Sequence, residues 1–207
     1  MADMWTTIAA ERGALAQDLS GLSEHEWAAR SLCTEWSVRD ALAHMTSTAQ
    51  MSPPKFVAGF AGSGFNFSKF SAKGIAKHRG SSSAETLQRF RDQQHSTAAP
   101  PGPKPSWLGE TIVHAEDIRR PLGIKHDYPV DAVTTVLDFY KGSNTLIGTK
   151  NRIDGLTLRA TDADWSHGEG PLVEGRLIDL LMAATGRKAA LDNLSGDGVV
   201  AFASRWG

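Results

Sequence analysis

The sequence contains a single cysteine, Cys33, and this scarcity limits the chemistry open to the protein. One cysteine forms no intrachain disulfide, and it leaves no paired cysteine motif for zinc or redox chemistry. Such cysteine usage fits the reducing environment of the cytoplasm, where we expect the protein to be located.

Long apolar runs are also lacking. The longest lies around Leu177–Ala184, which is too short to span a bilayer. The first 19 residues include Asp3 and Glu11 and have no apolar core flanked by cations, so they do not predict a signal peptide. We therefore expect no membrane partner.

The chain has no excess of charge of either sign. It carries 22 lysines and arginines against 23 aspartates and glutamates, and the cations are dispersed through its 207 residues. Without a basic patch that could follow a row of phosphates, nucleic acid is excluded as the expected partner. A hydrophobic content of 41% with 22% charged residues indicates an ordinary globular protein, a monomer or a homodimer, long enough to bury a sizeable core.

Helix signals dominate the chain up to residue 149. Ser37 with Asp40, and Ser82 with Glu85, have the spacing of a capping box, while Pro105 suits a first helical turn. Apolar residues at helical spacing follow these signals. The pattern predicts helices over residues 5–19, 37–50, 82–95, 105–120 and 130–146, with a short helix, a turn and a second helix over residues 56–77.

The pattern of apolar and polar residues changes after residue 150. Residues 156–161 alternate apolar and polar side chains, as a half-buried strand does, and residues 165–170 and 171–173 are further short strand candidates. We predict a helix over residues 177–186 and a last strand over residues 199–202. The fold class predicted is mainly α: an antiparallel four-helix bundle in residues 1–149 with a small C-terminal α+β cap in residues 150–207.

Two large aromatic residues are expected to be structural. Trp36 precedes the helix at residue 37, and Trp165 lies in the predicted cap. Because large aromatic side chains dominate core burial, we expect both to be buried anchors.

Glu110 and His114 are the first candidates for chemistry. They lie one helical turn apart, so a carboxylate and an imidazole project from one face and could bind one metal ion. A lone pair at this spacing also arises by chance and serves equally well as a surface contact. His44 lies in the middle of another capped helix, where a hydrogen-bonded core histidine is the commoner interpretation and a metal ligand the sharper one.

Other candidates each have a structural alternative. Cys33 could be a nucleophile or a ligand, or a small buried thiol. Asp40 could support a metal-binding histidine, or only cap its helix.

Asp117 and Arg120, together with Arg119, could clamp an anion or form a solvated helix end. His167 could contact a substrate or lie on the surface. The remaining histidines stand in polar surroundings and are expected to be exposed: His25, His78, His95 and His126.

Three sequence blocks say more than their spacing. Residues 31–45, SLCTEWSVRDALAHM, residues 110–123, ETIVHAEDIRRPLG, and residues 160–187, which include ATDADWSHGEGP and LLMAATGR, follow one another in order. Together they resemble the mycothiol-dependent maleylpyruvate isomerase family, which is part of the DinB-like superfamily of metal-binding helical bundles. Glu35, where that family commonly has glycine, Glu174, where a basic residue is common, and a shorter C-terminal part depart from the pattern.

The resemblance implies a function. In that family the histidine that ends the first motif and the Glu and His of the second bind a metal within the bundle, which here implies His44, Glu110 and His114 around one divalent ion, zinc by expectation. It implies that the metal activates a small thiol, mycothiol, for attack on a small electrophile, in an S-transferase or isomerase. The alternative is a non-catalytic protein that binds or senses a small molecule through the metal. Asp117, Arg120 and His167 are the expected substrate contacts.

Overall fold

The computed structural model describes residues 3–205 except residues 34 and 146, and divides the chain into two compact units, residues 1–126 and residues 127–207. The predicted boundary between residues 149 and 150 assigned the helix after residue 130 to the bundle. In the structure this helix belongs to the second unit, so the first unit alone contains the bundle.

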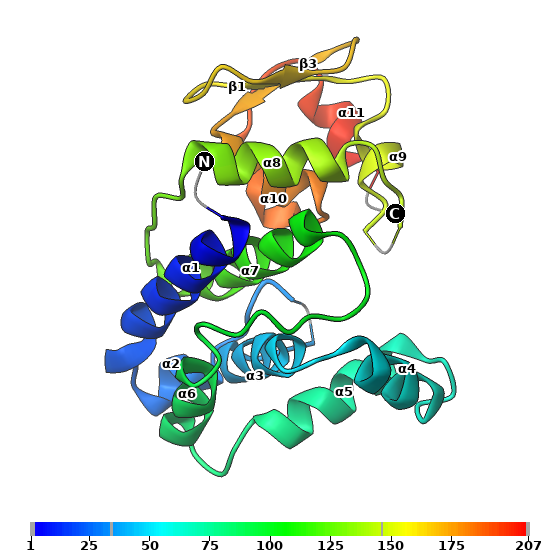
Figure 1. The fold of residues 1–207 in the computed structure, drawn as a ribbon. Coiled ribbons are helices and arrows are strands. Elements are labelled where there is room, and N and C mark those ends of the chain that lie inside the picture. The colour runs from blue at the N-terminus through cyan, green and yellow to red at the C-terminus, as the bar shows by residue number, and fades with distance from the viewer. Residues whose placement is uncertain (1–2, 34, 146, 206–207) are drawn as a thin grey trace. The chain divides into compact units, whose positions relative to one another are not determined.

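The regular elements described in the first unit are all helices (Figure 1). Single 3₁₀ turns extend two of its helices, at Leu19–Gly21 and Arg120–Leu122. Its α-helices are α1 (Met4–Asp18), α2 (Glu24–Ala28), α3 (Val38–Ala49), α4 (Pro53–Ala61), α5 (Phe67–His78), α6 (Ser83–Arg91) and α7 (Lys104–Arg119).

Four of these helices form the bundle, because α1 packs on α7, α7 on α3, α3 on α6 and α6 on α1. The core between them is apolar and almost free of solvent. It consists mainly of Leu15, Leu19, Trp27, Val38, Leu42, Met45, Leu87, Phe90, Ala115 and Ile118. The prediction of a mainly helical fold with a four-helix bundle is confirmed.

Hydrogen bonds at the helix ends give the directions of the bundle helices. The backbone N–H of Leu32, before α3, donates to the carbonyl of Asp117 near the end of α7, so α3 and α7 run antiparallel. Arg39 at the start of α3 donates to Thr86 at the start of α6, so these two helices run in the same direction. The predicted antiparallel arrangement therefore does not hold for this pair of helices. Parallel neighbours need a long connection, and α4 and α5 supply it.

Helix α5 makes the return along α3, and Gly74 allows its close approach. A Cβ atom at Gly74 would lie 2.5 Å from the Oγ atom of Ser47 on α3. The predicted helix, turn and helix over residues 56–77 is therefore confirmed, with one face of α5 covered by α3.

The second unit packs helices against a small sheet. It contains α8 (Val130–Tyr140), α9 (Thr149–Ile153), α10 (Leu177–Ala184), a 3₁₀ helix (Lys188–Asn193) and α11 (Val199–Ala203). The strands are β1 (Thr157–Ala160), β2 (Ser166–His167) and β3 (Leu172–Gly175), in the order β2-β1-β3. Leu158 of β1 pairs with His167 in antiparallel and with Val173 in parallel register.

The three predicted strands after residue 150 are confirmed, but the predicted strand over residues 199–202 is wrong. These residues form α11. Ser195 already occupies the position beside Glu174 of β3. Val200 is 81% exposed and Phe202 is fully buried, whereas in a strand both would point to the same face. A short apolar run cannot be assigned by periodicity alone.

No helix among the described residues is long and apolar enough to cross a membrane.

Trp165 provides a test of the second unit. Its side chain is 8% exposed and its indole N–H donates to Asp138 Oδ1 at 3.1 Å. We expect Trp165→Ala to lower the free energy of unfolding by about 3–5 kcal/mol, and Trp165→Phe, which keeps most of the packing, by about 1–2 kcal/mol. Urea unfolding followed by circular dichroism measures both. Val200→Ala, at an exposed position, is the control, and an alanine variant as stable as this control would contradict the assignment.

Candidate functional site

His44 is held in place by a well-capped helix. The Ser37 hydroxyl accepts from the backbone N–H of Asp40 at 3.1 Å, and the Asp40 carboxylate accepts from the backbone N–H of Ser37 at 3.2 Å. The carboxylate of Asp40 also pairs with Arg79 at 3.3 Å. Asp40 therefore caps α3 and ties it to the end of α5, the simpler of its two predicted roles.

The structure brings His44 together with both candidates on α7. The Nε2 atom of His44 lies 4.0 Å from Oε1 of Glu110, and the rings of His44 and His114 are 5.0 Å apart in an edge-to-face arrangement. One potential ligand atom from each of the three residues lies within 4.8 Å of the others. The antiparallel packing of α3 on α7 thus produces a cluster of two imidazoles and one carboxylate.

Glu110 is in an unusual state for a carboxylate. Its Oε1 atom is buried and has no hydrogen-bond partner within the described part of the chain. Burial raises the pKa of this carboxyl group, against the opposing effects of His114, Arg12 and the Thr48 hydroxyl. A buried carboxylate oxygen without a partner is costly unless a cation satisfies it.

The donor set fits a divalent metal ion. Two tetrahedral donors at zinc bond lengths lie about 3.4 Å apart, so the 4.0 Å between His44 and Glu110 needs only a small movement of the side chains. The side chains of His44, Glu110 and His114 keep exposed fractions of 15%, 13% and 15%, so the cluster is accessible from solvent. Imidazole and carboxylate ligands suit zinc and several other divalent ions.

A second group lies behind His114. The Nδ1 atom of His114 is 2.9 Å from Oδ2 of Asp117, and the Cys33 thiol donates to the same oxygen at 3.0 Å. The Asp117 side chain is fully buried. Its backbone carbonyl also accepts from Leu32, so Asp117 holds the segment before α3 against α7. Cys33, His114 and Asp117 are therefore an alternative set of potential metal ligands.

In the metal-free protein the pKa values of the two histidines are shifted in opposite directions. Burial and the charge of His114 lower the pKa of His44 to about 3, although Asp117 opposes this. For His114, burial also lowers the pKa, but hydrogen bonds to Asp117 and Cys33 and the charge of Asp117 outweigh it and raise the pKa to about 10. His114 therefore carries the proton at neutral pH, and His44 does not.

Trp36 forms a wall of the cluster. Its ring centroid lies 4.6 Å from that of His44 and 6.0 Å from that of His114. It packs against the apolar core as predicted, but it is only half-buried. Sequence reasoning missed this position, although the short distance from Trp36 to the start of α3 is visible in the sequence. Trp165, by contrast, is buried as predicted.

The remaining predicted site residues are held elsewhere. Arg120 donates to Glu116 at 2.7 Å, and the fully buried Arg119 pairs with Asp18 at 2.7 Å, so both serve helix packing. His167 belongs to β2 of the second unit, where burial and Lys141 lower its pKa. Substrate contact by Asp117, Arg120 or His167 stays a prediction, and the burial of Asp117 favours a role in positioning His114.

Two of the four histidines expected to be exposed are half-buried. His126 lies 2.7 Å from a carboxylate oxygen of Glu11, which is itself 5% exposed, and His78 lies on the last turn of α5. His25 and His95 are exposed as predicted. Polar neighbours in the sequence were misleading for His126, because its partner is on α1.

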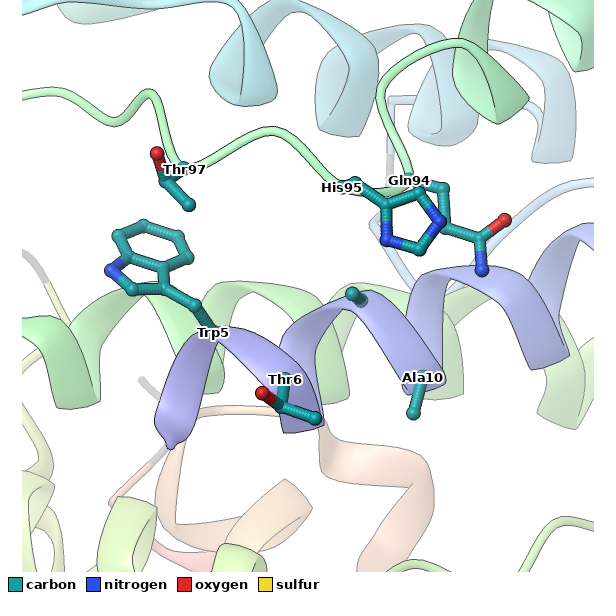
Figure 2. A pocket seen from close by; sticks show the side chains of 7 residues that line it. Trp5, Thr6, Ala10, Gln94, His95 and Thr97 are labelled. Carbon is teal, nitrogen blue, oxygen red and sulfur yellow. The ribbon is translucent and has the colours of Figure 1, made fainter. Parts of the chain in front are cut away.

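A groove of about 430 Å³ lies between α1 and the connection after α6 (Figure 2). None of the predicted site residues contributes to it. Its side chains are exposed or half-buried, and they come from Trp5, Thr6, Ala9, Ala10, Gln94, His95 and Thr97.

Comparison with known proteins identifies structures with a similar fold. Residues 8–106 match the sequence model of the mycothiol maleylpyruvate isomerase N-terminal domain. Two solved structures have the same fold: the mycothiol-dependent maleylpyruvate isomerase, with a TM-score of 0.59, and a histidine-to-alanine mutant of it, with a TM-score of 0.60. In both cases the identity is 16%, and the similarity covers 94% of this chain and 91% of the other. No curated protein sequence matches the chain.

The raised pKa of His114 gives a test of the metal-free protein. A group whose folded pKa is raised stabilises the fold below its unfolded pKa, near 6.5, and loses this contribution as the pH rises toward about 10. In the presence of a chelator, we expect the free energy of unfolding to fall between pH 7 and 9 by about 1.4 kcal/mol per pH unit for this proton.

Urea unfolding of the wild type and of His114→Gln over this pH range isolates the contribution. The variant should lose this part of the pH dependence, while His25→Gln, at an exposed position on α2, should keep it. Equal slopes for the wild type and His114→Gln would show that His114 is not protonated in the fold.

Proposed function

We propose that the protein, whose residues 8–106 match the sequence model of the mycothiol maleylpyruvate isomerase N-terminal domain, is a thiol-dependent isomerase or S-transferase with one divalent metal ion held by His44, Glu110 and His114. The observation that carries the proposal is the convergence of two imidazoles on Glu110, whose buried Oε1 atom has no hydrogen-bond partner among the residues that the structure describes. Zinc is the ion we expect, and mycothiol the thiol.

When bound, the ion would lower the pKa of a thiol that enters an open position. Two neutral imidazoles and one carboxylate leave one positive charge uncompensated on a divalent ion. A thiolate ligand would compensate it. Three protein ligands also leave at least one position open, as catalytic zinc sites do.

Asp117 positions His114 in this proposal. Its carboxylate accepts a hydrogen bond from the Nδ1–H of His114. This bond directs the Nε2 atom toward the cluster and fixes the orientation of the ring. Trp36 closes one side of both imidazoles and limits the water around them. The chain thus supplies the orientation and the partial desolvation that the chemistry needs.

The same contacts disfavour a hydrolase that uses this site. A hydrolase needs a general base beside the attacking water, and Asp117 is the carboxylate next to the cluster that could supply one. In the structure its side chain is fully buried and engaged by His114 and Cys33. Asp117 is therefore not placed to take a proton from water.

The proposed reaction joins a thiol to a small electrophile. The thiol sulfur bonds to a carbon of a polarised alkene or an epoxide, and the proton of the thiol ends on the product. In an isomerase, the adduct rotates about the bond that has become single and then releases the thiol unchanged. The protein forms no covalent bond to either partner.

Metal binding tests the ligand assignment. We expect His44→Ala, Glu110→Ala and His114→Ala each to weaken zinc binding by more than about 100-fold, and Asp117→Asn by about 10–100-fold, because it only orients His114. A competition titration of the apo-protein with a chelating dye measures these affinities. His95→Ala, which changes an exposed histidine, is the matched control.

The alternative set predicts a different pattern. If the ion were held by Cys33, His114 and Asp117, Cys33→Ser would abolish zinc binding and His44→Ala would leave it intact. That outcome would overturn the assignment. Because a proton and the ion compete for the imidazoles, affinity should also fall as the pH is lowered.

Turnover tests the proposed activity. The zinc-loaded full-length protein with mycothiol should consume a polarised alkene, such as maleylpyruvate, or an epoxide faster than the uncatalysed reaction. Glu110→Ala should lose this rate and His95→Ala should keep it. Thermal stabilisation by the thiol or the electrophile without turnover would contradict an enzyme and indicate a metal-dependent binding protein.

A further inference from the structure

The hairpin formed by α4 and α5 has a feature that the metal site does not use. Between residues 51 and 84 the chain contains four lysines and one arginine and no aspartate or glutamate. The other 173 residues carry 17 cations and 23 acidic residues. The dispersed charge expected from the composition therefore conceals one positively charged segment.

Three of the lysines form a stripe along α5. Lys69, Lys73 and Lys77 follow one another at intervals of four residues, and all are exposed. Like charges at this spacing destabilise a helix, and no acidic side chain between residues 51 and 84 offsets them. None of the three pairs with a carboxylate within the described residues. An anionic partner would relieve this repulsion.

The same hairpin carries exposed apolar side chains. Val57, Phe65 and Phe67 are 63%, 73% and 48% exposed, and α4 has no buried residue at all. The rings of Phe56 and Phe60 pack on Phe70 at 5.4 and 6.0 Å and form a small apolar cluster between the two helices.

Phe65 is held outward at the tip of the hairpin. Its φ of 57° makes it the one non-glycine residue with a left-handed backbone among those the structure describes. A bulky residue in this conformation is uncommon, and a glycine would adopt it more easily. The turn thus keeps the Phe65 ring largely in solvent, in edge contact with Phe60, at a conformational cost.

The lysine stripe borders the aromatic side of the hairpin. At about 100° per residue, Phe70, Lys73 and Lys77 share one side of α5. Ser71 and Ile75, on the neighbouring side, are buried, and α5 packs against α3. A helix with aromatic residues beside a row of lysines is the form that binds in the interface of a bilayer.

We propose that the α4–α5 hairpin docks on the surface of an anionic lipid bilayer. Phe65, Phe67 and Val57 enter the headgroup region, and Lys69, Lys73 and Lys77 contact anionic headgroups. This revises the expectation of no membrane partner, which rested on the lack of a spanning segment and on the overall charge. The proposal is independent of the metal site.

Vesicle binding by the full-length protein tests the proposal. We expect co-sedimentation with vesicles of phosphatidylglycerol and phosphatidylcholine at low salt, weaker binding as salt is added, and little binding to phosphatidylcholine alone. The triple variant Lys69→Gln, Lys73→Gln, Lys77→Gln should lose affinity on the order of 100-fold, at roughly fivefold for each lysine. Phe65→Ser with Phe67→Ser should also weaken binding.

The control is the triple variant Lys125→Gln, Lys150→Gln, Lys188→Gln, which removes the same charge from exposed positions outside the hairpin and should bind like the wild type. Absence of binding by the wild type, or equal losses in the two triple variants, would overturn the proposal. So would a wild-type homodimer, seen by analytical ultracentrifugation, that Phe65→Ser converts to a monomer, because the hairpin would then be an interface between copies. Circular dichroism confirms that each variant is folded.

Discussion

The buried contact between Asp117 and its partners is the constraint on which the rest of the site depends. Its side chain holds the ring of His114, and its backbone carbonyl holds the segment that leads into α3. One residue near the end of α7 therefore fixes both the orientation of an imidazole and the position of the opposing helix. Because the carboxylate is fully buried, the contact is shielded from water and from screening by salt.

Local sequence signals identified most of the helices and the first three strands, because capping residues and prolines act over a single turn. Ser37 with Asp40 marked the start of α3, and the alternation before Thr161 marked β1. The signals failed where contacts with distant parts of the chain determine the secondary structure. The run from Val199 to Phe202 suits a helix or a strand, and the neighbouring chain at β3 decided between them.

The spacing of Glu110 and His114 predicted a shared face but could not show what that face meets. Only the packing of α3 on α7, implied by the family resemblance and then found in the structure, brings His44 to them. The proximity of Cys33 to Asp117 spans 84 residues of sequence and has no local signal. Partners of this kind arise from tertiary packing, and sequence periodicity does not contain them.

The parallel direction of α3 and α6 has a consequence for how such a protein can change. Two parallel neighbours must be joined by a chain that returns the length of the bundle, and the proposed metal ligands place no demand on that chain beyond its span. The return segment can therefore gain charge, lose it or lengthen while α3 and α7 stay in register. Gly74, which packs closely on Ser47, and the pair of Arg79 with Asp40 tie its geometry to α3. In a bundle of this connectivity, the helices that hold the proposed site are separate from a return segment whose surface can change without disturbing them.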